Sequence, residues 1–249
     1  MILHPLDAIA DHRVDIGSRL ATDVRLDEAI ALRRCAMYRK AFRGTAIGYP
    51  AEAIRLDAMA GWMRRERVTV DVTSVDELDW AVLAGIHPSH IVMHGLDEAV
   101  GLTALDFGVG RVIVDSAEQM AMLRACATGP QAVVIDVTDA CLDRPLTVDR
   151  RVKFHGLHYR AGGADLTGLA EIIVAMIAEM AGISRKFGGV LSRLSVGDVD
   201  LTDGEVDPRS LRRVAQTINE VVEEACIRFR YPRPALTVSP SPITLLPAA

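Results

Sequence analysis

The stretch AIGYPAEAI, residues 46–54, decides the fold. Its first half is a short apolar run that predicts a buried strand, and Pro50 marks the end of that run. The second half predicts the start of a helix, so Glu52 stands where a strand ends and a helix begins. In α/β proteins, ligands bind at the carboxyl ends of parallel strands. Glu52 is therefore a candidate functional residue.

The same pattern repeats along the chain, because short β-rich runs alternate with helical segments. We count eight such runs, at residues 45–49, 68–72, 90–94, 111–115, 131–137, 152–159, 193–197 and 235–238. Alternating strands and helices predict a parallel sheet, and eight units predict closure into a (β/α)8 barrel. No G-x-G-x-x-G follows the first run, which disfavours an open dinucleotide-binding sheet.

Helices are expected between most of the runs, at residues 51–66, 74–83, 97–107, 116–126, 166–185 and 208–229. Residues 74–77 and 116–119 each read as a capping box. Residues 138–151 read as loop, so one helix is expected to be missing after the fifth strand. An N-terminal helix at residues 25–42 is expected to cover the barrel, since no helix is expected after the eighth strand. Residues 1–24 form an uncertain N-terminal segment, and residues 25–249 form the barrel domain.

Composition limits the class of protein. Half of the 249 residues are apolar, which suffices for one large core. The net charge of −5, with acids and bases interleaved, gives no basis for a nucleic-acid partner. No apolar run reaches the roughly 18 residues that a membrane helix needs. The scattered cysteines, without C-x-x-C, and a start without signal-peptide features predict a cytoplasmic protein with reduced thiols and no membrane partner.

Polar side chains gather at the expected strand ends. They are Glu52, Asp71, His94, Asp115, Ser116, Asp136, His158, Arg160, Asp198 and Ser239. Several carboxylates at one mouth raise one another's pKa unless cations intervene. Arg160, a protonated histidine, a bound cation or an amine ligand could supply the compensation. Asp136 lies inside an apolar run and needs a partner wherever it points.

Each candidate also has a plain structural interpretation. Asp71, Asp115 and Asp198 could cap the turns that follow them, and Glu52 could be an ordinary first-turn acid that favours the helix dipole. His94 and His158 could be hydrogen-bonded structural histidines. The sequence contains no H-x-H or H-E-x-x-H signature. The two histidines and the carboxylates could still hold a divalent ion.

The residues resemble the barrel domain of the fold-type III pyridoxal-phosphate decarboxylases, the diaminopimelate and ornithine decarboxylase family. YPAEA at 49–53 is similar to the family's Y-A-x-K-A. MHG at 93–95, GVG at 108–110, VDS at 114–116, GLH at 156–158 and LTVSP at 236–240 resemble the family's later motifs in order and spacing. The resemblance implies an alanine-racemase-like barrel over roughly residues 25–249.

The departures from the family fall on its cofactor contacts. Glu52 stands at the position of the Schiff-base lysine and Arg160 at that of the histidine that stacks on the cofactor. Gly163 replaces a phosphate-contacting serine, and GDV at 197–199 replaces the phosphate-binding G-G-G. Ser239 replaces the carboxylate that pairs with the pyridine nitrogen, and Asp136 replaces an arginine. The family's C-terminal β-domain is expected to be missing.

No other lysine is expected to substitute. The chain has only Lys40, Lys153 and Lys186, and all three are predicted to lie away from the mouth. The resemblance therefore led us to expect no pyridoxal phosphate and no functional pyridoxal-phosphate decarboxylase.

Three functions follow as hypotheses. The first is a binding protein or pseudoenzyme for a protein partner or a small amine or amino-acid-like metabolite, as a homodimer or with a related enzyme. The second is a lyase or isomerase that works without the cofactor. In it Glu52 or Asp136 would be the base, Arg160 would bind a substrate carboxylate and His158 would relay protons. Asp71, His94, Asp115, Ser116, Asp198 and Ser239 would bind substrate. The third is a residual pyridoxal-phosphate binder.

Overall fold

The computed structural model describes residues 28–95, 98–138, 150–162, 164–199 and 207–246. Its centre is a closed barrel of eight parallel strands in sequence order, with β1 paired to both β2 and β8. The strands are β1 Ala46–Pro50, β2 Thr69–Val72, β3 Ile91–His94, β4 Arg111–Val114, β5 Gln131–Asp136, β6 Val152–Arg160, β7 Arg193–Val199 and β8 Ala235–Pro240. The predicted (β/α)8 barrel is confirmed.

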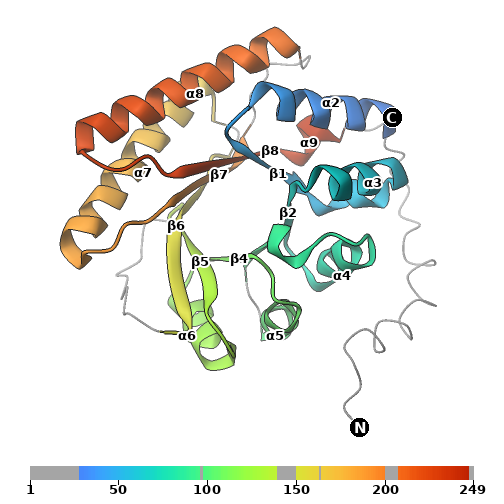
Figure 1. Cartoon of the computed structure of the whole chain (residues 1–249), viewed down its shortest axis with the longest axis horizontal. Helices are drawn as coiled ribbons and strands as arrows, with labels where there is room; N and C mark the ends of the chain where they lie inside the picture. Colours follow the sequence, from blue (N-terminus) through green and yellow to red (C-terminus); the bar gives the residue numbers. More distant parts are fainter. Residues whose placement is uncertain (1–27, 96–97, 139–149, 163, 200–206, 247–249) are drawn as a thin grey trace.

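Helices surround the barrel (Figure 1). They are α2 Glu28–Ala41, η1 Ala51–Arg55, α3 Asp57–Glu66, α4 Val75–Leu83, η2 Pro88–His90, α5 Glu98–Phe107, α6 Ala117–Cys126, α7 Leu166–Phe187, α8 Pro208–Phe229 and α9 Pro242–Leu245. The helix expected at 51–66 is in fact two pieces, because the extended backbone of Leu56 separates η1 from α3. The prediction that no helix follows the eighth strand was wrong, since the short α9 does. The loop expected at 138–151 falls mainly on residues outside the described part.

The N-terminal helix α2 fills the place in the ring between α8 and α3, as expected (Figure 1). Buried Tyr49 of β1 donates a hydrogen bond of 3.0 Å from its hydroxyl to the carbonyl of Cys35 in α2. Arg34 of the same helix donates one of 2.8 Å to the carbonyl of Thr244 in α9. These contacts fix α2 against the first strand and the last helix.

Both predicted capping sequences form reciprocal hydrogen bonds, although the Glu or Gln side chain reaches the N–H just before the N-cap residue. Ser74 accepts a hydrogen bond from the backbone N–H of Glu77, whose carboxylate accepts one from the N–H of Thr73. Ser116 accepts from the N–H of Gln119, whose side-chain oxygen accepts from the N–H of Asp115. The starts of α4 and α6 are therefore fixed beside the ends of β2 and β4.

Helix α7 is long and apolar enough to cross a membrane by length and composition alone. The helix contains no uninterrupted apolar run of that length, because Glu171 and Glu179 interrupt it. In the barrel it packs against α8, β6 and β7, and Leu169, Ile173 and Ile177 are fully buried. These contacts are typical of a core helix.

The barrel interior has its own apolar layer. Val92, Ile113 and Val134 form a buried cluster separate from the core between the strands and the helices. Because side chains alternate along a strand, the residues two positions later also point inward, one layer nearer the carboxyl ends. On β3 and β5 those residues are His94 and Asp136, whereas Asp115 follows the end of β4 and is exposed.

Candidate functional site

The centre of the mouth is a carboxylate near the end of β2 whose side chain is only 16% exposed. Asp71 Oδ2 accepts a hydrogen bond of 2.6 Å from the Ser239 hydroxyl of β8, and Oδ1 lies 3.3 Å from Nε2 of His94 of β3. The capping interpretation of Asp71 fails, because Ser74 caps the following helix. Burial alone would raise the pKa of Asp71. The nearby His94 imidazole and the hydrogen bond from Ser239 outweigh it and lower that pKa below its usual range.

Gly48 makes room for this carboxylate. A Cβ atom at Gly48 would lie 2.1 Å from the Ser239 hydroxyl oxygen and 2.2 Å from Oδ2 of Asp71. The hydrogen bond between β8 and β2 therefore runs across the face of β1 where a side chain would otherwise stand. Only glycine is compatible with this contact.

A second group surrounds His158 of β6. His158 is fully buried, its Nδ1 lies 3.1 Å from the Ser195 hydroxyl of β7, and its ring meets that of His94 edge-on at 5.2 Å. Its Nε2 is buried without a hydrogen-bond partner among the described residues. Burial first, and the charges of His94 and Arg160 next, lower the pKa of His158 to about 4, although Asp136 and Asp71 oppose the shift. His158 is therefore neutral near pH 7, and Nε2 is a polar atom that a ligand could satisfy.

A third group joins β5 to β6. Oδ2 of Asp136 lies 3.1 Å from Nε of Arg160, and Oδ1 accepts a hydrogen bond of 2.5 Å from the Thr138 hydroxyl. The Thr138 hydroxyl oxygen in turn accepts one of 2.8 Å from the N–H of Arg160. The partner that Asp136 needed is thus Arg160, which also supplies a half-exposed cation at the rim.

The other predicted site residues lie at the edge of this arrangement. Glu52 is half-buried in η1, near enough to Glu77 to add to the effect of burial in raising the pKa of Glu77. Asp115 is exposed, and Ser116 caps α6. Asp198 is exposed, with a left-handed backbone at φ 53°.

Sequence reasoning missed Ser195, Thr138 and Gly48, and it noted Gly197 only as part of the altered phosphate motif. A Cβ atom at Gly197 would lie 2.9 Å from Cε1 of His158, so this glycine leaves space for the imidazole. Ser195 lies two positions before Gly197 on β7, and strand alternation could have placed both on the inner face beside His158.

All three lysines lie within the described residues and away from the mouth. Lys153 is at the start of β6, Lys40 is in the last turn of α2 and Lys186 is in the last turn of α7. No cluster of three or more potential metal ligands occurs among the described residues.

The chain is similar to known proteins in sequence. Residues 29–184 match the family described as "Pyridoxal-dependent decarboxylase, pyridoxal binding domain". The chain is 33% identical over 165 residues to a diaminopimelate decarboxylase of Mycobacterium tuberculosis, covering 65% of this chain and 35% of that protein. It is 31% identical over 127 residues to one of Actinosynnema pretiosum, covering 50% and 29%. The chain thus spans about a third of the length of these curated relatives.

Solved structures show the same barrel. A diaminopimelate decarboxylase from M. jannaschii in complex with L-lysine superposes with a TM-score of 0.74 at 14% identity, covering 89% of this chain and 60% of that one. A lysine/ornithine decarboxylase from Vibrio vulnificus in complex with putrescine gives 0.72 at 14% identity, covering 98% and 69%.

These findings correct our expectation that the chain binds no pyridoxal phosphate. The matching family is defined by its pyridoxal-binding domain, and the matching curated proteins are pyridoxal-family decarboxylases, so the comparisons point to cofactor binding. The error has a physical reason. Ser239 stands in the sequence where the family has a carboxylate. The fold, however, brings the Asp71 carboxylate to within 2.6 Å of that serine hydroxyl. The buried Nε2 of His158, this carboxylate and the Arg160 cation fit the cofactor, although Glu52 does not fit its covalent attachment.

Proposed function

Because this chain belongs to the pyridoxal-dependent decarboxylase family through its pyridoxal-binding domain, we propose that its barrel binds pyridoxal phosphate without a covalent bond. The binding site is the mouth formed by the ends of β2, β6 and β8. The observation that carries the proposal is the Asp71 carboxylate, which is partly buried there, accepts a hydrogen bond from Ser239 and lies beside His94.

Asp71 is the residue that would hold the pyridine ring. Its lowered pKa keeps it ionised at neutral pH, and an ionised carboxylate favours a proton on a neighbouring ring nitrogen. The bound cofactor would supply an electron sink for carbanions, which a proton on its ring nitrogen strengthens. Asp71 would therefore both orient the ring and hold the proton at that nitrogen.

Arg160 is the cation best placed to meet the phosphate group. Its side chain is 51% exposed at the end of β6, and Asp136 holds the guanidinium through Nε. A guanidinium has five N–H donors, so it can bind a carboxylate on one edge and a phosphate on another. Neutral His158 beside it can donate or accept through Nε2 without adding charge.

Glu52 determines which form of the cofactor is preferred. It stands where the first strand ends, and no lysine is available at the mouth to form an imine. A carboxylate pairs with an ammonium group, so Glu52 favours the amine form of the cofactor, pyridoxamine phosphate, over the aldehyde. Basic amino acids and diamines are the substrate class that this acidic rim suits, in keeping with the L-lysine and putrescine bound in the two solved structures.

Calorimetric titration tests the proposal. We expect saturable one-to-one binding of pyridoxamine phosphate, with weaker binding of pyridoxal phosphate. Asp71→Asn should weaken both by about tenfold or more, since it removes a charge-assisted hydrogen bond. Asp76→Asn, at an exposed acid in the first turn of α4, should leave both unchanged. The proposal fails if neither form binds saturably or if the two variants behave alike.

A second candidate is a binding site for a free cationic amine, as in our first hypothesis. The acidic side chains of Glu52, Asp115 and Asp198 around the mouth favour it. Saturable binding of putrescine or lysine by the protein alone, weakened by Glu52→Gln, would support this function. Amine binding that requires added cofactor would instead support the first proposal.

A further inference from the structure

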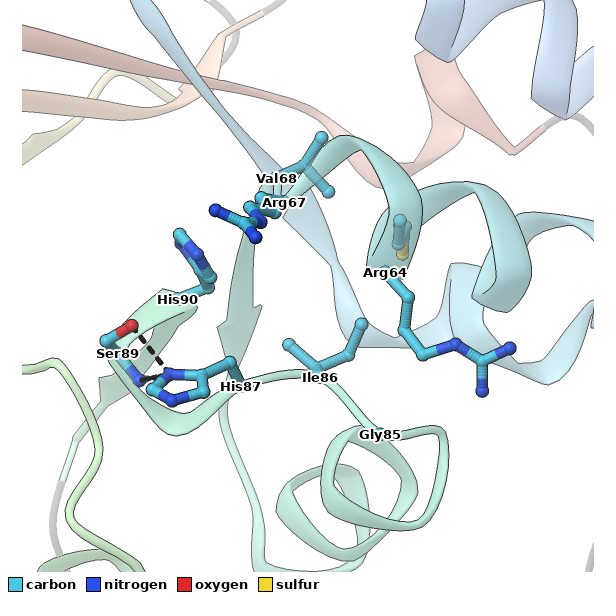
Figure 2. Close-up of a pocket in the computed structure, with 9 residues that line it drawn as sticks. Arg64, Arg67, Val68, Gly85, Ile86, His87, Ser89 and His90 are labelled. Atoms are coloured by element: carbon cyan, nitrogen blue, oxygen red, sulfur yellow. Dashed lines mark hydrogen bonds between the residues drawn. The ribbon is translucent and has the colours of Figure 1, made fainter.

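The opposite end of the barrel carries a cavity that the mouth does not explain. It has a volume of about 460 Å³ and lies where the chain enters β2 and β3. Its lining residues are Met63, Arg64, Arg67, Val68, Gly85, Ile86, His87, Ser89 and His90, shown in Figure 2. Four of these are basic and none is acidic. The volume is within the range of small-molecule sites.

The polar wall of the cavity is built rigidly. Gly110, just before β4, donates a hydrogen bond of 2.8 Å to the carbonyl of Pro88, and a Cβ there would lie 2.3 Å from the carbonyl oxygen of Ser89. The 3-10 turn η2 is thus pressed against the start of β4. Within the turn, Nδ1 of His87 lies 3.3 Å from the N–H of Ser89 and 2.8 Å from its hydroxyl oxygen (Figure 2).

These contacts assign the proton on His87. A backbone N–H can only donate, so Nδ1 accepts, and the neutral ring carries its hydrogen on Nε2. That N–H points away from the turn. Arg67 and His90 lie close together on the same side of the cavity, whereas the guanidinium of Arg64 points away from them and donates to the carbonyl of Ala84 (Figure 2).

The charged side chains among the lining residues are all basic, although Glu66 directly precedes Arg67 in the sequence. Burial lowers the pKa of His90, and the charges of His87, Arg67 and Arg111 lower it further. The pKa of His155, in β6, is also lowered. Burial is the main cause, and the charges of Arg193, Arg111 and Lys153 add to it. The basic side chains near the cavity therefore interact unfavourably with one another, and a bound anion would relieve this.

We propose that this cavity binds a small multiply charged anion that carries phosphate groups. Arg67 would bind phosphate oxygens through its planar guanidinium, and His90 and the Nε2–H of His87 would donate to the others. The buried side chains of Met63, Val68 and Ile86 form an apolar floor, which gives room for an organic part of the ligand. The inference does not depend on the proposed function of the mouth.

The chain offers a matched control for Arg67. Arg67 ends α3 in a left-handed conformation, with φ 51° and ψ 47°, and Arg230 ends α8 at φ 53° and ψ 46°. Asparagine tolerates this conformation, so Arg67→Asn and Arg230→Asn each remove one exposed positive charge at the same backbone geometry. Only the first removes it from the cavity.

The experiment is a calorimetric titration of the full chain with inorganic pyrophosphate at constant ionic strength. We expect one-to-one binding, weakened about tenfold or more by Arg67→Asn and also weakened by His90→Gln, with Arg230→Asn binding like the wild type. Binding should be tighter at pH 6 than at pH 8, because the anion favours protonated His90. The absence of saturable binding, or equal losses in the two arginine variants, would overturn the proposal.

Two further variants separate this cavity from the mouth, since pyridoxal phosphate itself carries a phosphate. Asp71→Asn should leave pyrophosphate binding unchanged, and Arg67→Asn should leave the binding of pyridoxamine phosphate unchanged. If Arg67→Asn abolishes binding of both ligands, the cofactor occupies the cavity and the proposed function of the mouth fails. If Asp71→Asn abolishes both, the mouth binds pyrophosphate and the cavity proposal fails. Should Arg67→Asn not fold, His90→Gln serves in the same comparison.

Discussion

Ser239 donates a 2.6 Å hydrogen bond to Asp71 across the face of β1, joining residues 168 positions apart in the sequence. The pair places a carboxylate at the centre of the mouth, and the hydrogen bond helps to keep it ionised. Strands β2 and β8 each contribute one side chain to this contact. Gly48 of β1, which lies between them, leaves space for it because it has no side chain. The account of cofactor binding depends on this pair.

Removing the Ser239 hydroxyl should weaken cofactor binding less than removing the carboxylate. In Ser239→Ala, Asp71 loses one of the hydrogen bonds that lower its pKa, so its pKa should rise. We expect the affinity for pyridoxamine phosphate to fall several-fold at neutral pH and more steeply as the pH is lowered. Fluorescence titration across pH measures this. Ser241→Ala, at a serine without a side-chain cap hydrogen bond, is the control and should match the wild type.

Gly48→Ala should be strongly destabilising. The new methyl group would overlap both partners of the Asp71–Ser239 hydrogen bond, at 2.2 Å and 2.1 Å. Overpacking costs roughly 1–3 kcal/mol, and loss of a buried charge-assisted hydrogen bond adds a comparable amount. Urea denaturation should therefore show a loss of about 3 kcal/mol. Gly61→Ala in α3, where a Cβ meets nothing within 4 Å, should instead stabilise by up to about 1 kcal/mol.

The stability of the protein should fall as the pH drops from neutral. The pKa of His158 is lowered from 6.5 to about 4, so the folded protein keeps it neutral while the unfolded chain takes up a proton below pH 6.5. The stability that His158 contributes is complete above pH 6.5 and is lost as the pH falls toward 4. Linkage gives about 2 kcal/mol between pH 7 and pH 5. Asp71 affects stability only at lower pH. Because its pKa is lowered, the stability that it contributes is lost only as the pH falls below the ordinary value of 3.8.

Urea denaturation at the two pH values measures this dependence. His158→Asn should remove most of it, whatever that variant does to stability at pH 7. His87→Asn, at an exposed histidine, should retain it. A wild-type pH dependence in His158→Asn would show that another group is responsible.

Much of the fold was predictable because it rests on local signals. The eight strands were found within one or two residues at their starts, since apolar runs and turn residues mark them, and α8 was predicted at residues 208–229, where the structure has Pro208–Phe229. The break at Leu56 was not, because the sequence from Ala51 to Glu66 keeps a helical pattern across it. Tertiary contacts of η1 with α4 and β2 decide that geometry.

The site was predictable residue by residue but not as an arrangement. Strand ends identified Asp71, His94 and Ser239 separately, yet the contact between Asp71 and Ser239 depends on barrel closure through β1. Ser195 escaped notice because a serine in a strand carries no signal of its own. Reading position 239 without its neighbour led to the wrong expectation about the cofactor.

Glu52→Lys should restore a covalent attachment. The substitution puts an amine where the first strand ends and removes the carboxylate that disfavours the aldehyde. On addition of pyridoxal phosphate we expect a new imine absorbance band and, after borohydride reduction, one stoichiometric adduct on the introduced lysine, located by peptide mass spectrometry. Glu52→Gln removes the same charge without an amine and should give no such adduct. An unmodified introduced lysine would mean that position 52 does not face the cofactor.

The most direct test of the central claim, that the cofactor is held at Asp71 without a covalent bond, is equilibrium dialysis of the wild-type protein with pyridoxal phosphate and pyridoxamine phosphate. The protein samples with bound cofactor are then treated with borohydride and unfolded, and the mass of the protein is measured by mass spectrometry. We predict about one equivalent bound at saturation, released completely on unfolding, with binding lost in Asp71→Asn. No saturable binding, or a stoichiometric adduct on Lys40, Lys153 or Lys186, would contradict the account.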